Sequence, residues 1–258
     1  MPAPSVASCV PGFVVASRSV FLPESETLVV SDLHIGRDEA SDVEFPLGER
    51  ADLRERLTAL LDRFSPAEVV FAGDVLHSFG RASVATRETL GELTDVCRKR
   101  GVRPVLVVGN HDTMLSSVWD GPLYDEYRPG GGNGEGGGGG GDDGNGGPTA
   151  DVLVCHGHEE PDGDADCYVV GHDHPTIDIE GRRRPCFLYG PETYRVSDVL
   201  MLPAFSRLAP GVEINRMYTR DFQSPLVTDA DALRPLVYDE DSEETLRFPP
   251  LGKFRRML

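Results

Sequence analysis

All seven histidines of the chain lie in short motifs that also contain acidic residues, asparagine or glycine. The motifs read SDLHIG, GDVLH, GNHD, CHGH and GHDHP, and they supply Asp32, His34, Asp74, His77, Asn110, His111, Asp112, His156, His158, His172 and His174. Carboxylate and amide oxygens and imidazole nitrogens are ligands for divalent cations, and no thiolate pair accompanies them. These residue types therefore point to metal-ion chemistry.

The candidate ligands are too many for one ion. A catalytic zinc uses three protein ligands and a water, whereas this chain offers seven: Asp32, His34, Asp74, Asn110, His156, His172 and His174. Seven donors suit two adjacent cations that share a carboxylate. The mixture of Asp, Asn and His favours Mn(II), with Fe, Zn or Ni as alternatives, over Mg or Ca. Two cations roughly 3.5 to 4 Å apart can share a hydroxide and clamp a phosphoryl group, so no protein nucleophile is required.

Predicted strands and helices place these motifs. Residues 12–32 read as short strands, and the segments EVVFAGD and PVLVVGNHD read as strands with short, unalternating apolar runs. Between them, leucines at helical spacing predict a helix over 46–64, and a second helix is predicted over 83–99. In open α/β sheets, functional groups gather where the strands end. The pattern β-α-β-α-β thus predicts an α/β fold in which the motifs meet at one sheet edge.

The second half of the chain continues with strands. DVLVC and CYVV precede two further histidine motifs, and hairpin strands are expected over 176–190 and 198–206, as the second half of a sheet. The region from about residue 226 onward is acidic and weakly periodic, and no chemistry is assigned to it. A Gly/Asp-rich, low-complexity stretch at about 129–149 is interpreted as a surface insertion in one domain spanning 1–258, with a linker between two domains as the alternative.

The composition restricts the partners. With 43 acidic and 25 basic residues the net charge is -18, which repels nucleic acid and anionic membranes at low salt. Only Lys99 and Lys253 are lysines, and an acidic, lysine-poor chain suits a halophile's cytoplasm. An arginine-rich codon usage is the alternative explanation. Five scattered cysteines without a C-x-x-C pair, no targeting segment and no long apolar stretch predict a soluble cytoplasmic protein.

The ordered motifs D-x-H, G-D-x-x-H, G-N-H-D, H-G-H and G-H-x-H resemble those of the calcineurin-like metallophosphoesterase superfamily. Each motif alone is weak evidence, but all five occur in order between Asp32 and His174, and the strand pattern extends the likeness from about residue 12 to 215. GHDHP followed by LPAF at 202–205 looks more like the archaeal and bacterial branch that includes DNA-ligase-associated phosphoesterases than like the protein phosphatases.

The resemblance implies a fold and a set of roles. The fold would be a four-layer α-β-β-α sandwich with the metal site at the carboxyl ends of the strands. One ion would be held by Asp32, His34 and His174, the other by Asn110, His156 and His172, with Asp74 bridging them. His111 resembles the catalytic histidine that stabilises or protonates the leaving oxygen, and Asp112 is expected to orient its ring.

Several residues keep two interpretations. His77 and His158 either contact the substrate or the metal ligands, or have structural roles, and His156 and His158 could exchange roles. Arg182, Arg183 and Arg184 either grip a phosphate or form a charged hairpin tip. Cys155 is expected in the core.

The function favoured by the sequence is a two-metal hydrolase of phosphate esters, more specifically a phosphodiesterase that uses a metal-bridging hydroxide. Its substrate would be a phosphate ester, with nucleotide-like esters among the candidates and no membrane partner. One alternative is a DNA nuclease resembling the double-strand-break repair nucleases of the superfamily, against which the acidic charge counts. A second alternative, from another class, is a non-catalytic metal-binding interaction scaffold, although every expected ligand is present.

Overall fold

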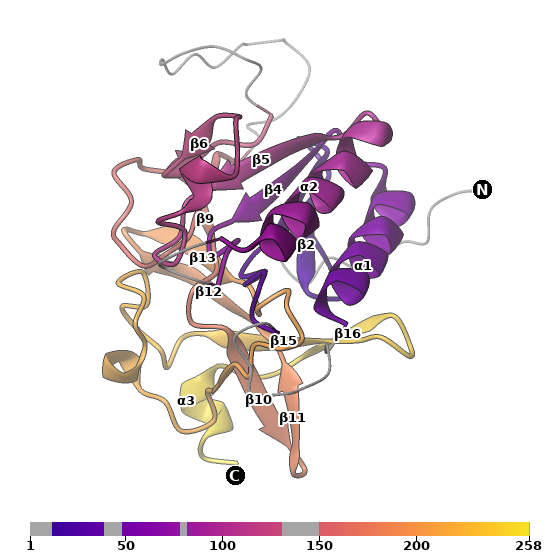
Figure 1. Cartoon of the computed structure of the whole chain (residues 1–258). Coiled ribbons are helices and arrows are strands. Elements are labelled where there is room, and N and C mark those ends of the chain that lie inside the picture. Colours follow the sequence, from indigo (N-terminus) through magenta and orange to yellow (C-terminus); the bar gives the residue numbers. More distant parts are fainter. Residues whose placement is uncertain (1–11, 39–47, 78–81, 131–149, 258) are drawn as a thin grey trace, which may run out of the picture.

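The computed structural model describes residues 12–38, 48–77, 82–130 and 150–257. Within these ranges two large β-sheets pack face to face, and two long helices cover the outer face of the first sheet (Figure 1). The expected α/β fold is confirmed. No helix in these ranges combines the length and the apolar content that crossing a bilayer requires.

The first sheet has six strands in the order β1-β2-β3-β4-β5-β6. They are β1 (Val14–Ala16), β2 (Ser19–Leu22), β3 (Thr27–Val30), β4 (Glu68–Ala72), β5 (Arg103–Val107) and β6 (Leu123–Tyr124). The strands from β3 to β6 are parallel, whereas β1 and β2 add antiparallel neighbours. Every residue of β3 and β4 is buried, as expected for strands covered on both faces.

The two long helices begin and end close to the predicted residues, 46–64 and 83–99. Helix α1 (Glu49–Phe64) begins after Gly48, whose φ of 75° is left-handed, and it buries its leucines against the sheet. Helix α2 (Val84–Lys99) begins after Ser83, because the Ser83 hydroxyl accepts a hydrogen bond from the Thr86 amide at 2.9 Å.

The second sheet has seven strands in the order β16-β15-β12-β13-β9-β8-β7. They are β7 (Glu126–Tyr127), β8 (Val152–Cys155), β9 (Cys167–Val170), β12 (Phe187–Tyr194), β13 (Ser197–Met201), β15 (Arg234–Asp239) and β16 (Glu244–Arg247). Apolar side chains of both sheets, such as Val29, Val70, Val169 and Leu200, form the central layer. The weakly periodic C-terminal region thus supplies two strands: β15 and β16 form a hairpin, and β15 pairs with β12, which lies far away in the chain.

The outer face of the second sheet is covered differently from the first. Met217, Phe222 and Leu226 pack on it together with the short helix α3 (Leu251–Phe254). Within the described ranges no long helix lies there, so this fourth layer is mainly irregular chain rather than the helices that the resemblance implies. Prolines at 203, 210, 225 and 235 interrupt this part of the sequence and prevent a continuous helix.

A third, three-stranded sheet was not expected. It contains β10 (Pro175–Ile179), β11 (Arg182–Pro185) and β14 (Val212–Glu213). The hairpin predicted after residue 176 exists, but β10 and β11 leave the main sheet, and only β12 and β13 extend it. The hairpin projects from the body of the molecule below the two main sheets (Figure 1).

The predicted insertion at about 129–149 lies outside the described residues from 131 onward. The strands on either side of it are direct neighbours, since β7 pairs with β8 in antiparallel register, Glu126 opposite Cys155. Arg128 and Asp151 form an ion pair at the same place. The two ends of the excursion thus leave and rejoin one sheet edge.

Candidate dinuclear metal centre

The loops that follow β3 and β4 run side by side. The Asp32 amide donates a hydrogen bond to the Gly73 carbonyl at 3.1 Å, and the His34 amide donates to the Asp74 carbonyl at 2.9 Å. The parallel pairing of the two strands therefore continues into SDLHIG and GDVLH. This pairing brings three of the predicted ligands to one sheet edge, as the strand pattern indicates.

Five candidate ligands have a left-handed backbone. Their φ angles are 57° for Asp32, 47° for His34, 48° for Asp74, 76° for His172 and 48° for His174. Such angles are uncommon for residues other than glycine, although Asp and His tolerate them better than most, and they concentrate at functional sites. Both the D-x-H and the H-x-H segment thus turn sharply at a strand end, which the sequence alone does not reveal.

Two of the motif glycines leave room for the ligands. Gly73 has a φ of 81°, and a side chain there would overlap the ring of His156. A side chain at Gly171 would overlap the hydroxyl of Ser31 and the carboxylate of Asp32. The glycine that precedes Asp74 and the one that precedes His172 are therefore part of the packing between the motifs.

Four side chains converge in a first cluster. Ligand atoms of Asp32, His34, Asp74 and His174 all lie within 4.8 Å of one another. His174 Nε2 is 3.0 Å from Asp32 Oδ1 and 3.2 Å from His34 Nε2, and His34 Nε2 is 4.0 Å from Asp74 Oδ2. All of them are buried except His174, whose side chain is 16% exposed.

A second group forms around His156, which is 1% exposed. His156 Nε2 is 3.1 Å from Asn110 Oδ1 and 3.4 Å from Asp74 Oδ1. The ring centroid of His172 lies 5.0 Å from that of His156, and the His172 amide donates to Asp32 Oδ2 at 3.2 Å. His156 Nδ1 lies 3.2 Å from the carbonyl oxygen of Ala72, which holds the ring with Nε2 toward Asp74.

The electrostatics of these groups favour a cation between them. Burial lowers the pKa of His34 to about 3 and that of His156 to about 4, so both imidazoles are neutral lone-pair donors at physiological pH. Burial raises the pKa of Asp74 to about 8, and the charge of Asp32 adds to the rise. Burial works against the ionisation of Asp32, but His174 outweighs it and lowers the pKa of that carboxyl. Two buried carboxyls that repel each other, surrounded by neutral imidazoles, fit divalent cations.

The donor set therefore fits two metal ions. Asp32, His34 and His174 would hold one, Asn110, His156 and His172 would hold the other, and Asp74 turns one oxygen toward each group. A match to a family model decides the classification: residues 26–196 match the calcineurin-like phosphoesterase family. The chain belongs to the calcineurin-like phosphoesterase family. It is accordingly a metal-dependent phosphoesterase, with a family fold that carries a dinuclear metal centre.

A solved structure agrees with this classification at the level of the fold. A nuclease named MPE from Pseudomonas putida superposes with a TM-score of 0.56 at 23% sequence identity, covering 89% of this chain and 92% of that one. Yfce, a phosphoesterase from E. coli, gives a TM-score of 0.41 at 14% identity, covering 87% of this chain and 98% of that one. A comparison with curated protein sequences finds no match.

The candidate catalytic histidine of this phosphoesterase lies at the open side of the first cluster. The His111 side chain is 25% exposed, and its Nε2 is 3.8 Å from Asp74 Oδ2. Its amide donates to Asp74 Oδ1 at 2.9 Å, and its Nδ1 lies 3.3 Å from the carbonyl oxygen of His77. The ring thus presents Nε2 to the first cluster.

Asp112 contributes in a different way from the one expected. Its carboxylate accepts hydrogen bonds from the amides of Leu76 at 2.8 Å, Gly109 at 2.9 Å and Val75 at 3.2 Å. It therefore links the GDVLH loop to the GNHD loop. The carbonyl oxygen of His77, in place of the expected Asp112 carboxylate, lies next to Nδ1 of the His111 ring. The reason is burial: Asp112 is 3% exposed and is surrounded by backbone amides that need an acceptor.

His77 and His158, for which the sequence left two interpretations, each lie beside one of the two groups of candidate ligands. The His77 ring stacks on that of His111 at 6.1 Å between centroids, and His34, His77 and His111 form a further group of adjacent ring nitrogens. The His158 ring is tilted against His156 at 5.2 Å, on the outer side of the second group. His156, not His158, is the one whose nitrogen reaches Asp74 and Asn110.

The remaining motif residues have structural contacts. The Asp173 carboxylate, between His172 and His174, accepts from the amides of Gln223 and Ser224 at 2.9 and 3.0 Å, so it points away from the cluster. Cys155 is buried in the core. Arg183 and Arg184 pair with Glu213 and Asp239, as expected for a charged hairpin.

Two supporting residues were not identified from the sequence. The buried Glu49 at the start of α1 accepts hydrogen bonds from the amides of Gly36 at 2.7 Å and Arg37 at 3.2 Å, which fixes the loop after His34. Ser31 donates to the Asp32 carboxylate, and its own carbonyl accepts from the Phe205 amide at 2.8 Å. This second hydrogen bond attaches the LPAF segment to the D-x-H loop. The sequence does not reveal the role of Ser31, because a serine next to a candidate ligand is common.

Proposed function

We propose that this phosphoesterase hydrolyses phosphodiesters with two divalent cations, Mn(II) being the favoured metal. One observation carries the proposal: the two oxygens of Asp74 face different groups, Oδ2 toward His34 and Oδ1 toward His156. A carboxylate placed in this way can contribute to two adjacent ions. Asp32, His34 and His174 would then complete the first site, and Asn110, His156 and His172 the second.

The bound cations would supply Lewis acidity and a water of lowered pKa. The chain's own contribution begins with the buried carboxylates of Asp32 and Asp74, which provide the negative charge that holds the cations. His111 has its Nδ1 against the His77 carbonyl, which leaves Nε2 facing the substrate side. We infer that His111 acts as the imidazolium: it delivers its Nε2 proton to the leaving oxygen and is left neutral, with the remaining proton on Nδ1 toward the His77 carbonyl. General acid catalysis of this kind contributes roughly 10² to 10⁴-fold.

A protein nucleophile is not needed, and the nearest thiol is unsuited to the task. Cys155 precedes His156, but burial raises the pKa of its thiol to about 12, so the thiolate is scarcely populated at neutral pH. The Ser31 hydroxyl is engaged with Asp32. Attack by water is the step that remains consistent with the residues around the cluster.

The preference for diesters rests on the motif likeness of GHDHP and LPAF to the branch that includes DNA-ligase-associated phosphoesterases. In this structure LPAF is attached to the D-x-H loop through the Phe205 amide and the Ser31 carbonyl. The LPAF segment, which carries the likeness to this branch, is thus hydrogen-bonded to the residue that precedes the candidate metal ligand Asp32.

The test is hydrolysis of bis-p-nitrophenyl phosphate against p-nitrophenyl phosphate in molar KCl, with and without Mn(II). Molar salt is chosen because the net charge of -18 is then screened. Metal-dependent turnover of the diester at least tenfold above that of the monoester supports the proposal. Faster turnover of the monoester by folded, metal-loaded protein would contradict the diesterase preference, and no turnover of either would contradict the activity.

A nuclease is the second candidate, supported by the fold likeness to the Pseudomonas putida nuclease MPE, which extends over 89% of this chain. A nuclease with this acidic surface should cleave DNA more readily as salt rises from low to molar concentration, because screening removes the repulsion. Cleavage of labelled single- and double-stranded DNA across that range tests it. The interaction scaffold is disfavoured because all seven candidate ligands and His111 are retained.

A further inference from the structure

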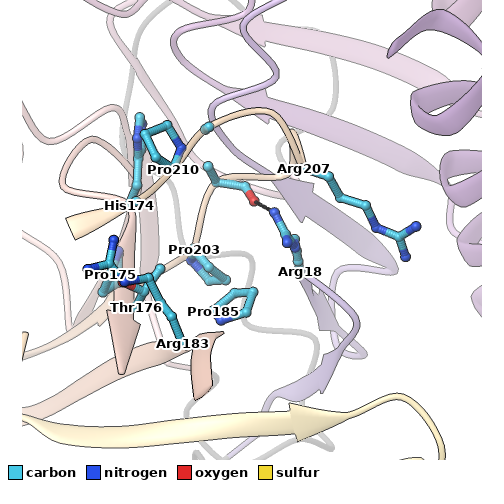
Figure 2. A pocket seen from close by; sticks show the side chains of 12 residues that line it. Arg18, His174, Pro175, Thr176, Arg183, Pro185, Pro203, Arg207 and Pro210 are labelled. Atoms are coloured by element: carbon cyan, nitrogen blue, oxygen red, sulfur yellow. Dashed lines mark hydrogen bonds between the residues drawn. The ribbon is translucent and has the colours of Figure 1, made fainter. Parts of the chain in front are cut away.

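A cavity of about 190 Å³ adjoins His174. His174, Thr176 and Arg183 form one wall, while Arg18 and Arg207 lie across from them, with prolines between the two walls (Figure 2). Because His174 belongs both to the first cluster and to this cavity, a group bound here would be next to a phosphate held at the cluster. We call it the His174 cavity.

Arg18 is the distinctive cation of this cavity. Arg183 pairs with Glu213 at 3.1 Å, and Arg207 pairs with Asp52 at 3.0 Å and Glu240 at 3.4 Å. The half-buried Arg18 instead donates from Nη1 to the carbonyl oxygens of Ala204 and Ser206, at 3.0 and 2.8 Å. Within the described part of the chain no carboxylate lies within ion-pairing distance of it. A sheltered guanidinium without a carboxylate partner is a site for an anion, and its geometry suits phosphate.

The rest of the lining fits the same ligand. The Thr176 side chain is 7% exposed, and its hydroxyl has no hydrogen-bond partner among the described residues. A buried hydroxyl without a partner is costly, and a bound oxygen would satisfy it. Pro175, Pro185 and Pro203 bring no N–H groups, so they offer rigid apolar surface suited to a sugar.

The neighbouring cavity limits how far an anion extends. It measures about 260 Å³ and shares Arg18, Pro185 and Arg207 with the His174 cavity. Its far side carries Asp239, Glu240 and Asp241, which repel phosphate. The path from the cluster past Arg18 therefore has room for one further phosphate and not for a long polyanion.

We propose that the His174 cavity binds a second phosphate of the substrate, with Arg18 as its cation, so that the preferred diesters are nucleotidyl esters carrying a phosphate beside the scissile one. This inference rests on the proposed phosphodiesterase function, because it places the scissile phosphate at the metal cluster. It adds to the proposed function a second phosphate site and the residue, Arg18, that would bind it.

The experiment compares esters that differ by one phosphate. Thymidine 5′-(p-nitrophenyl phosphate) is measured with and without a 3′-phosphate, and thymidine 3′-(p-nitrophenyl phosphate) with and without a 5′-phosphate, which covers both polarities. In one of the pairs the added phosphate should raise kcat/KM about tenfold or more, mainly through KM. Ratios near one in both pairs would overturn the inference, whereas turnover of the esters themselves would leave the phosphodiesterase function standing.

The variants assign the effect to Arg18. Arg18→Gln removes the charge and the guanidinium that reaches the Ala204 and Ser206 carbonyls, so the ratio within the pair should fall to near one. Arg18→Lys keeps the charge and should retain part of the ratio. Arg87→Gln, on the exposed face of α2 and outside both cavities, is the matched control and should keep the full ratio. A ratio that survives Arg18→Gln would overturn the assignment.

A binding measurement keeps the inference testable without turnover. Titration calorimetry of the Mn(II)-loaded protein compares thymidine 3′,5′-bisphosphate with the two monophosphates of thymidine. Tighter binding of the bisphosphate by about tenfold in the wild type, lost in Arg18→Gln, supports the site even if no ester is hydrolysed. Equal affinities would overturn it. Thermal unfolding of each variant verifies that it is folded.

Discussion

Asp74 and His156 meet across the two sheets: Asp74 Oδ1 lies 3.4 Å from His156 Nε2, although one residue follows β4 and the other follows β8. The contact joins the edge of the first sheet to the edge of the second. Because the other oxygen of Asp74 faces His34, this carboxylate is the common member of both candidate metal sites.

Replacing the common carboxylate should remove more than one metal contact. We expect Asp74→Asn to lower kcat/KM for bis-p-nitrophenyl phosphate by at least 100-fold and to reduce the bound metal from two ions per chain to one or fewer, measured by elemental analysis. Asp62→Asn is the control, since Asp62 lies on the exposed side of α1 and, among the described residues, its ion pair is with Arg100. Two retained ions in Asp74→Asn would contradict its bridging position.

Removing the candidate proton donor should affect turnover and not the metals. His111→Ala should reduce kcat by roughly 10² to 10⁴-fold while both ions stay bound, because the ring faces the open side of the cluster. The loss should be smaller for substrates with good leaving groups such as p-nitrophenol than for alkyl esters, which need protonation more. An equal loss for both kinds of ester would argue that His111 has another role.

A matched glycine pair tests the packing around His156. Gly73 and Gly101 have similar left-handed φ angles, 81° and 75°, but a side chain at Gly73 would overlap the His156 ring, whereas nothing lies within 4 Å at Gly101. Both Gly→Ala variants therefore bear backbone strain, and only Gly73→Ala should also lose metal and activity. If the two variants behave alike in metal content, the contact of Gly73 with His156 is unimportant.

The metal-free protein should lose stability between pH 7 and pH 8.5. In the folded state burial raises the pKa of Asp74 to about 8, from 3.8 in the unfolded chain, so the folded state binds the extra proton in this range. Stability is then present at lower pH and falls as pH rises through the folded value, by up to about 1 kcal/mol. The histidines with lowered pKa act in the opposite direction, but only below about 6.5.

Urea unfolding of EDTA-treated protein checks this. The midpoint should decrease with pH in the wild type and decrease less steeply in Asp74→Asn, in which Glu49, whose pKa burial raises to about 7, still loses a proton. Bound Mn(II) should remove the part of the dependence that is due to Asp74, since the cation displaces the proton. Parallel curves for wild type and Asp74→Asn would show that Asp74 is not the titrating group.

Deleting the glycine-rich insertion should have little effect. Its flanking strands β7 and β8 pair directly, and Arg128 and Asp151 form an ion pair beside them, so a short Gly/Ser linker can replace residues 131–149. We expect the melting temperature to stay within about 3 °C and kcat/KM within about twofold. Loss of soluble folded protein would contradict the interpretation of this stretch as an insertion.

Much of the first half of the fold could be predicted because its signals are local. Leucines repeat along α1 at helical spacing, Ser83 caps α2, and β3 to β5 are short apolar runs that end in polar motifs. The second half was harder. The hairpin of β15 and β16 joins the sheet through β12, which is distant in the sequence, and the outer layer is formed by irregular chain whose apolar residues have no period.

The sequence by itself determined the residue types and the order of the site: Asp32 and His34, Asp74, Asn110, His156, and His172 with His174 are named by motif. Only the tertiary structure decided which atoms meet. It turned the Asp112 carboxylate to backbone amides instead of the His111 ring, chose His156 over His158, and placed Arg18 beside His174. The physical reason is that motifs reflect local chain chemistry, whereas these contacts depend on the packing of two sheets and on left-handed turns at the strand ends.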